Sequence, residues 1–351
     1  DARSRVPARV ELMNILQAGI IGLGVGEQHI DAYASHPAFE LRSMCDINAS
    51  KLAEVSQRHS GVSTTENPED ILRDPAINVI SIATYDNYHA EQILEALKEG
   101  KHVFVEKPLC LFLDEAIKIA IAHRKRPDLK LSSNLILRCS RRFQDLKARI
   151  TDGELGEVYA IEADYNYGRI EKLTDGWRGE LDFYSVILGG GVHMVDLIRW
   201  LTGAEVEEVF STGNRVATAG SRFRYPDYVC TLLRLDNGMR AKVSANFGCV
   251  HPHFHGLTVF GTKATFINGT PNARLITSRD PEGSAETITT AYPGCAKGDL
   301  IGDFLDEITG EGFMEVTAEE VFRTMAVCFA AEESLNTGKP VAVKSIQDQI
   351  L

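Results

Sequence analysis

Apolar runs alternate with amphipathic stretches along the first part of the chain. Residues 15–21, 78–84 and 102–105 form short, mostly apolar runs, and each precedes a stretch whose apolar positions recur at helical spacing. Apolar strands separated by helices are typical of a parallel sheet with helices on both faces. The pattern predicts an α/β fold whose N-terminal domain, residues 14–135, is a doubly wound Rossmann sheet.

The periodicity changes in the second part of the chain. Residues 156–169 and 227–248 alternate apolar and polar positions, which is typical of half-buried antiparallel strands. Within the second segment, Asn237 and Gly238 predict a type I′ hairpin turn. We expect residues 136–351 to form an α+β domain with a mostly antiparallel sheet, which binds substrate and mediates oligomerisation. Residues 1–13, which lack the apolar core of a signal peptide, are expected to be a disordered tail, a cloning remnant or an upstream start.

Composition narrows the class of protein. The 351 residues carry 37 basic and 49 acidic side chains, a net charge of -12, which disfavours nucleic acid and anionic membranes as partners. No apolar run reaches the ~20 residues of a membrane span. The seven cysteines are scattered and include no CxxC pair, so we expect free thiols and a cytoplasmic location.

A glycine-rich turn, residues 22–26, follows the first predicted strand and opens a helix. Such a turn lets backbone N–H groups approach a pyrophosphate, although Glu27 replaces the third glycine of the strict pattern. Asp46, at the end of the second strand, would accept hydrogen bonds from a ribose 2′-hydroxyl and repel a 2′-phosphate. The sequence therefore favours NAD over NADP. The expected cofactor contacts here are Gly22, Gly24, Val25, Gly26 and Asp46.

The apolar strand at residues 102–105 ends on Glu106, Lys107 and Pro108. Side chains at the carboxyl end of a parallel strand point into the crevice where such sheets bind ligands. There a lysine can hydrogen-bond a reacting hydroxyl and move protons, with Glu106 holding its ammonium or contacting the cofactor. Without this context, Lys107 would be a surface lysine after a strand.

Several segments resemble one known family. Residues 84–108, TYDNYHAEQILEALKEGKHVFVEKP, resemble the T-P-N-x-x-H…A-L-x-x-G-K-H-V-x-x-E-K-P signature of the Gfo/Idh/MocA oxidoreductases, the glucose-fructose oxidoreductase and inositol dehydrogenase family. Residues 19–29 resemble its phosphate turn, and residues 191–203 resemble its G-x-H-x-x-D-x-x-x-W-L-x-G helix. The resemblance extends over nearly all of residues 14–345.

The resemblance implies NAD(P)-dependent hydride transfer at a carbinol carbon of a sugar, sugar nucleotide or cyclitol. Lys107 matches the active-site lysine of the family, and His193 matches its acid/base histidine, a role that suits a side chain with an unperturbed pKa near ~6.5. The resemblance also places the loop after the fourth strand beside the cofactor. The contacts expected from it are Thr84, Tyr85, His89, Glu106 and Lys107.

Two departures from the family pattern affect the expected chemistry. Tyr85 and Asp86 replace the usual Pro-Asn pair, and Gly189 stands where many members carry an aspartate four residues before the histidine. Either His193 acts alone, or Lys107 is the main base, or another group takes part in proton transfer. The candidates for that group are Tyr184, Asp182 and Tyr167.

Aromatic and basic residues gather in segments expected to border the crevice. Residues 165–179 are expected to form a loop over the site, with Arg178 among its pocket candidates, and residues 215–224 carry three arginines for a solvated loop or a substrate phosphate or carboxylate. These arginines favour an anionic substrate, such as a nucleotide-linked sugar. The predicted substrate contacts are Asn134, Arg138, Tyr165, Tyr167, Arg169, Trp177, Tyr184 and Asp196.

Three histidines, His251, His253 and His255, recur at a spacing of two, which places them on one face of a strand. A zinc site would need cysteine or carboxylate ligands beside them, and the sequence offers none. We therefore expect no metal, and either a place for one histidine in the substrate pocket or a plain strand edge.

The favoured function is a NAD-dependent sugar or cyclitol dehydrogenase that works as a homo-dimer or homo-tetramer through its antiparallel sheet. Two alternatives remain: a glycosidase that retains NAD and shows no net cofactor change, and a non-catalytic NAD-binding regulator.

Overall fold

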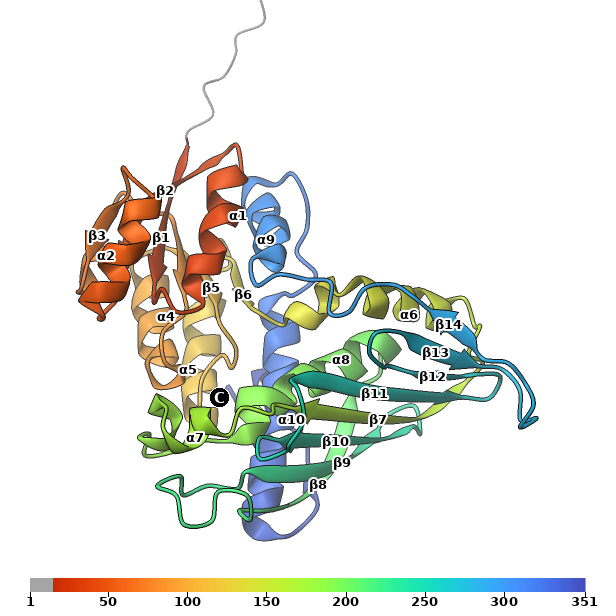
Figure 1. Cartoon of the computed structure of the whole chain (residues 1–351). Helices are drawn as coiled ribbons and strands as arrows, with labels where there is room; N and C mark the ends of the chain where they lie inside the picture. The colour runs from red at the N-terminus through yellow and green to blue at the C-terminus, as the bar shows by residue number, and fades with distance from the viewer. Residues whose placement is uncertain (1–14, 351) are drawn as a thin grey trace, which may run out of the picture.

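The computed structural model describes residues 15–350, which form two β-sheets lying next to each other (Figure 1). The tail expected at residues 1–13 lies outside the described residues. The predicted fold class is confirmed, because the first sheet is wholly parallel and the second is mostly antiparallel.

The first sheet has six parallel strands in the order β3-β2-β1-β4-β5-β6. Its strands are β1 (Leu16–Ile21), β2 (Phe39–Cys45), β3 (Ser63–Thr65), β4 (Val79–Ile82), β5 (His102–Val105) and β6 (Leu131–Ser133). Its helices are α1 (Ile30–Ser35), α2 (Ala49–Arg58), α3 (Glu69–Leu72), α4 (His89–Lys98) and α5 (Leu113–Arg124). The strand order reverses direction between β1 and β4, and ligands of such sheets bind outside the carboxyl ends at that point.

Two residues at helix ends, one before α2 and one after α4, determine where these helices begin and end. Asn48 Oδ1 accepts a hydrogen bond from the backbone N–H of Lys51 at 3.1 Å, which caps α2. Gly100 follows α4 with a φ of 78°, a left-handed conformation that glycine adopts without steric cost. The chain therefore turns directly from α4 into β5, at whose carboxyl end Lys107 emerges.

The second sheet has nine strands in the order β14-β13-β12-β11-β7-β10-β9-β8-β15, and only β7 and β10 pair in parallel. Its long central strands are β7 (Val158–Asn166), β8 (Val206–Asn214), β9 (Tyr228–Leu235), β10 (Arg240–Asn246) and β11 (Phe254–Gly261). The shorter strands are β12 (Thr265–Ile267), β13 (Ala273–Ile276), β14 (Glu286–Ile288) and β15 (Val341–Ala342). The helices α6 (Arg141–Thr151), α8 (Val192–Thr202) and α10 (Ala318–Thr337) lie along one side of this sheet (Figure 1).

The turn between β9 and β10 differs from the prediction. Gly238 has a φ of 86°, but among residues 15–350 no residue other than glycine has a positive φ. A type I′ turn needs a positive φ at Asn237 as well, so the predicted turn type is wrong. Instead, a loop of three residues, 236–238, joins the strands, and the backbone N–H of Leu235 donates to the carbonyl of Met239 at 3.1 Å.

Helix α9 (Asp299–Thr309) returns to the first sheet although it follows the second sheet in sequence. It lies beside α1 (Figure 1), and the rings of Phe304 and Phe104 on β5 are 5.6 Å apart. The end of β6 lies close to the expected domain boundary at residue 135, yet the core of the first sheet includes a helix from the far end of the chain. Among the described residues, no helix is long and apolar enough to cross a membrane.

Candidate active site

A cavity of about 480 Å³ lies at the carboxyl ends of β1, β2 and β4. Five predicted cofactor residues line it: Gly22, Gly24, Asp46, Thr84 and Tyr85. Val25 and Gly26 lie in the same turn but do not line the cavity, and a Cβ added to Gly26 would lie 2.9 Å from Ile20 Cγ2. The structure therefore brings the glycine turn, the acid of β2 and the loop after β4 to one cavity.

The glycine turn leaves room for a ligand to approach the backbone. Gly22 has a φ of 89°, and an added Cβ would lie 2.6 Å from the carbonyl carbon of Ala83. A Cβ added to Gly24 would meet nothing within 4 Å, so the turn is open on that side. Asp46 is fixed at the cavity edge, because its Oδ2 accepts from the N–H of Leu23 at 2.7 Å and its Oδ1 from the N–H of Asn48 at 2.8 Å. These residues fit a dinucleotide.

Lys107 leaves β5 toward the second sheet, where its Nζ donates a hydrogen bond to the carbonyl of Gly189 at 2.9 Å. Burial lowers the pKa of Lys107 to about 8, the nearby carboxylate of Asp86 opposes this shift, and the charge of Lys297 adds to it. A lysine whose pKa lies near neutral pH can give and take protons, which a solvated lysine with a pKa near ~10.4 does poorly.

Glu106 lies behind Lys107 and is buried. Its Oε1 accepts from Asn134 Nδ2 at 2.6 Å and lies 3.4 Å from His29 Nε2, an ion-pair distance without hydrogen-bond geometry. Burial alone would raise the pKa of Glu106, but the contact with His29 and the charges of Lys297 and Lys107 hold it at about 2. Glu106 therefore remains a carboxylate that supports the lysine, and it does not line the cofactor cavity.

His89 is buried between two loops rather than in the cavity. Its Nδ1 lies 2.8 Å from the carbonyl oxygen of Pro108, and its Nε2 lies 3.2 Å from that of Thr84. A neutral imidazole donates to one of these carbonyls at a time. His89 thereby ties the loop after β4 to the loop that carries Lys107, which is a positioning role.

His193 lies in the first turn of α8 and is buried. Its ring centroid is 5.9 Å from those of Tyr165 and His255, and neither ring nitrogen hydrogen-bonds to another described residue. Burial and the charges of Lys107 and Lys297 lower the pKa of His193 well below its usual value. The ring is therefore neutral at neutral pH and free to accept a proton.

Gly189 lies in a π-helical turn, Ile187–Gly191, that leads into α8. A Cβ added to Gly189 would overlap the Tyr184 hydroxyl and lie 2.9 Å from Tyr184 Cζ. The phenol thus fills the space of the missing aspartate, while Asp182 is fully exposed and Tyr167 lies beside Tyr165, with ring centroids 6.0 Å apart. Of the three residues considered for proton transfer, Tyr184 is the one that contacts this position.

The segment over the site is partly helical, with α7 (Glu171–Thr174) and the 3₁₀ turn Trp177–Gly179. Trp177 stacks on Tyr85 of the cofactor loop, with ring centroids 4.6 Å apart and an interplanar angle of 17°. Arg222 fastens this segment, because its Nε donates to the carbonyl of Thr174 at 2.8 Å and its Nη1 lies 3.0 Å from Glu180. Arg222 therefore has a structural role here.

Arg138 and Asp196 do not face the crevice. Arg138 Nη2 donates to Asp196 Oδ1 at 2.6 Å and to Glu320 Oε2 at 2.9 Å, and both Arg138 and Asp196 are buried. These contacts form an internal ion-pair network that joins α8 to α10. Asn134 points toward the site but uses its amide to hold Glu106 and the carbonyl of Lys297, the latter at 2.8 Å.

Only His255 lies in β11, while His251 and His253 precede it, so the predicted strand through all three histidines is wrong. Two of the three still reach the site. The rings of His253 and His255 are 4.9 Å apart, and His253 lies 5.2 Å from Tyr165. His255 Nδ1 lies 2.6 Å from the Tyr292 hydroxyl, which occupies that nitrogen. His251 is exposed outside this group. Within residues 15–350, these histidines do not form a group with metal-binding spacing.

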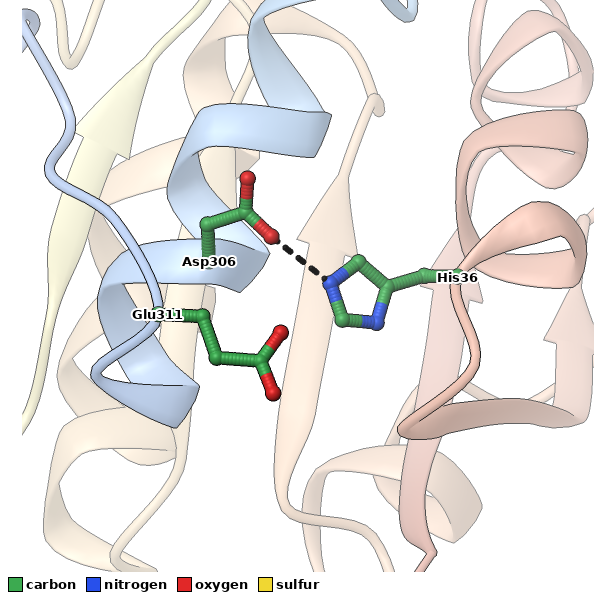
Figure 2. Close-up of side chains that lie close together, drawn as sticks. All are labelled: His36, Asp306 and Glu311. Atoms are coloured by element: carbon green, nitrogen blue, oxygen red, sulfur yellow. Dashed lines mark hydrogen bonds and ion pairs between the residues drawn. The ribbon is translucent and has the colours of Figure 1, made fainter.

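Another group does have such spacing: His36, Asp306 and Glu311 (Figure 2). His36 Nε2 lies 3.0 Å from Asp306 Oδ1, and the backbone N–H of Ala38 donates to His36 Nδ1 at 3.2 Å. Because Nδ1 accepts a hydrogen bond, Nε2 carries the proton of a neutral ring and is not available to a metal. The pair instead joins the end of α1 to α9.

Sequence reasoning missed Lys297 and His29. Lys297 lies in the loop before α9, and its charge acts on Glu106, Lys107 and His193. No motif surrounds it, and only the return of α9 to the first sheet brings it to the site. His29 lies in residues 19–29, which resemble the family's phosphate turn, yet its contact with Glu106 depends on the strand order.

Comparisons with known proteins agree with this geometry. Residues 16–133 match the profile of an oxidoreductase family with a NAD-binding Rossmann fold, and residues 143–267 match the Gfo/Idh/MocA C-terminal domain. Uncharacterized oxidoreductase YrbE of Bacillus subtilis is 25% identical, over 93% of this chain and 96% of its own length. Myo-inositol 2-dehydrogenase of Thermotoga maritima is 25% identical, over 76% of this chain and 79% of its own.

Among solved structures, a levoglucosan dehydrogenase in complex with NADH and L-sorbose superposes with a TM-score of 0.83 at 21% identity. The match covers 95% of this chain and 100% of that one, and at this identity it shows the fold alone. The profile matches lie on the two sheets that build the site, one on each. The chain belongs to the Gfo/Idh/MocA family of oxidoreductases.

Proposed function

We propose that the protein is a NAD-dependent dehydrogenase that transfers a hydride between nicotinamide and a secondary alcohol carbon of a sugar, sugar nucleotide or cyclitol. The observation that carries this proposal is the meeting of Lys107 and His193 beside the cofactor cavity. Lys107 reaches across from the first sheet to Gly189, four residues before His193. Relatives named as inositol and levoglucosan dehydrogenases support the class of substrate.

In this mechanism NAD supplies the hydride acceptor, and the chain handles the proton. Lys107 hydrogen-bonds the reacting hydroxyl, since its Nζ lies at the junction of the two sheets and has a lowered pKa. His193 takes the hydroxyl proton, because burial keeps its ring neutral and its nitrogens have no hydrogen-bond partner in the described part of the chain. Glu106 favours the protonated lysine through its negative charge, without an ion pair or hydrogen bond between the two side chains in the described part of the chain.

We further propose that the enzyme prefers NAD to NADP. Asp46 at the cavity edge would repel a 2′-phosphate. Lys51 also lines the cavity, but its Nζ is paired with Glu27 Oε2 at 2.7 Å. The comparison is made by titrating NADH and NADPH against the protein, and tighter binding of NADPH would contradict the assignment.

The activity is tested by the near-ultraviolet absorbance of reduced nicotinamide. The protein and NAD are mixed with inositols, free sugars, uronates and nucleotide sugars, with Lys107→Ala as the inactive control and Lys263→Ala, which lies away from the site, as the matched control. An absorbance rise with one class of compound, lost only in Lys107→Ala, supports the proposal. Glycoside cleavage without net NADH formation, or NAD binding without any turnover, would contradict it.

A further inference from the structure

Arg178 presents a guanidinium that is held in place at one end and free at the other. Its Cζ lies 4.4 Å from the centroid of the Trp177 ring, and its Nε donates to the Tyr184 hydroxyl at 3.0 Å. Within residues 15–350, its two Nη groups make no hydrogen bond, and no carboxylate lies within ion-pair distance. Stacking and the Nε bond fix the plane of the fork, so that both Nη groups are available as a pair.

Such an arrangement is unusual for a half-buried charge. Removing a cation from water is costly unless it gains a partner, and most buried arginines are paired. Arg138 in the 3₁₀ turn Ile136–Cys139 shows the ordinary case, since it binds both Asp196 and Glu320. A guanidinium with two parallel N–H donors matches the two oxygens of a carboxylate or phosphate.

Two further cations, Lys297 and Arg169, lie near the aromatic side chains of the site. The Lys297 ammonium makes no hydrogen bond or ion pair with any residue in 15–350, and its charge acts on His193, His253 and His255. Arg169 Cζ lies 5.4 Å from the centroid of Tyr167, the ring that Arg178 approaches to 6.0 Å. Both arginines therefore flank Tyr167, whose neighbour Tyr165 lies against His193.

The carboxylates of the site do not neutralise these cations. Glu106 is held by Asn134 and by its contact with His29. Asp86 acts on Lys107 and on Arg178 through space, but it lies beyond ion-pair distance from both. The two carboxylates of the site, Glu106 and Asp86, are thus outnumbered by four cations: Lys107, Arg169, Arg178 and Lys297.

We propose that the substrate carries an oxyanion, a carboxylate or a phosphate, that binds the free fork of Arg178 while its alcohol carbon lies at Lys107 and His193. This inference rests on the proposed dehydrogenase function and names its substrate class: uronates, sugar phosphates or nucleotide sugars rather than neutral polyols. Lys297 and Arg169 add attraction for the same charge.

Turnover is measured on pairs in which one member carries an oxyanion and the other is neutral: glucose with glucuronate and glucose 6-phosphate, galactose with galacturonate, and glucose with UDP-glucose. We expect kcat/KM to favour the anionic member by roughly ten- to hundredfold, the value of a charge-assisted hydrogen-bond pair. In Arg178→Gln this ratio falls toward one. In Arg224→Gln, whose exposed side chain donates to the carbonyl of Leu181 and lies 3.8 Å from Asp182, the ratio is unchanged. Phosphate and carboxylate members of the panel distinguish the two sources of the oxyanion.

Binding of the oxyanion is measured separately from turnover. With NADH at saturation, inorganic phosphate is titrated against chloride at constant ionic strength, and the melting temperature is followed. We expect phosphate to stabilise the wild type and Arg224→Gln but not Arg178→Gln. Equal responses in all three proteins, or equal turnover of neutral and anionic sugars, would overturn the oxyanion site and leave the dehydrogenase proposal intact. Absence of any NAD turnover, with the phosphate response present, would instead overturn the dehydrogenase proposal alone.

Discussion

The hydroxyl of Tyr184 lies where a side chain on Gly189 would begin. The two residues are therefore coupled: the phenol can stand there only because residue 189 is a glycine. An aspartate at that position and a tyrosine at 184 exclude each other in this backbone arrangement.

Gly189→Ala tests this relationship through stability. An added Cβ overlaps the Tyr184 hydroxyl, and overpacking of a core costs about 1–3 kcal/mol of unfolding free energy. Gly191→Ala is the matched control in the same turn, since its Cβ would approach nothing more closely than the flexible end of Ile187, at 3.1 Å. Urea unfolding should show a larger loss for Gly189→Ala, and equal losses would contradict the steric account.

Tyr184→Phe tests the phenol in catalysis. Burial raises the pKa of Tyr184, so the hydroxyl keeps its proton and can donate it to a substrate oxygen while Arg178 donates to the phenol. We expect kcat to fall by roughly 10²-fold, in the range of a lost acid–base partner, with little change in stability. Steady-state kinetics together with a melting curve make the comparison, and a normal kcat would remove Tyr184 from the chemistry.

Lys107→Met should stabilise the protein while abolishing activity. The folded-state pKa of Lys107 is about 8, below its unfolded value near ~10.4, so the folded protein disfavours the charged form. Below pH 8 both states hold the proton and the full penalty applies. Between pH 8 and about 10.4 the unfolded chain binds more protons, so wild-type stability rises with pH. The advantage of the variant should therefore shrink over that window in unfolding experiments. An advantage that grows with pH would contradict the burial of this amine.

Trp177 should report cofactor binding by its fluorescence. The chain has two tryptophans, and Trp177 stacks on Tyr85, which lines the cofactor cavity. In Trp200→Phe, addition of NADH should change the remaining emission. In Trp177→Ala, loss of a stack worth about 0.5–1.5 kcal/mol should weaken NADH binding several-fold by calorimetry. Unchanged emission and affinity would mean that the stack is independent of the cofactor.

The open face of the second sheet is the expected contact between subunits. Phe210 pairs with Leu232, and Leu232 pairs with Lys242 across this face, with both apolar side chains exposed. Light scattering should give a dimer or tetramer mass for the wild type and a smaller mass for Leu232→Glu. A monomer mass for the wild type would refute the prediction.

The sequence predicted the fold, and it placed the glycine turn, Asp46 and Lys107 at the carboxyl ends of their strands, because these features depend on local patterns. Strand and helix periods gave the order of elements, and the carboxyl end of β5 placed Lys107 in the crevice. The turn at Asn237 was predicted wrongly because asparagine and glycine also suit a three-residue loop, which needs a positive φ only at Gly238.

Long-range contacts explain what the sequence did not show. Asp196 follows His193 by three residues, yet it pairs with Arg138, which also binds Glu320 because α10 packs against that side of α8. Lys297 and Tyr184 lie in irregular loops, and such loops have no hydrophobic periodicity from which their position could be predicted. The sequence does not distinguish Tyr184 from Asp182, because both residues lie at a similar distance from Gly189 along the chain.

The return of α9 to the first sheet has a consequence for synthesis on the ribosome. The face of the sheet that carries Phe104 receives Phe304 only after nearly the whole chain has been made. Until then, a nascent nucleotide-binding sheet exposes apolar surface, which is a hazard for aggregation. A gene fragment that stops after β6 would therefore yield a sheet without its cover, so the nucleotide-binding sheet depends on helix α9 for part of its core.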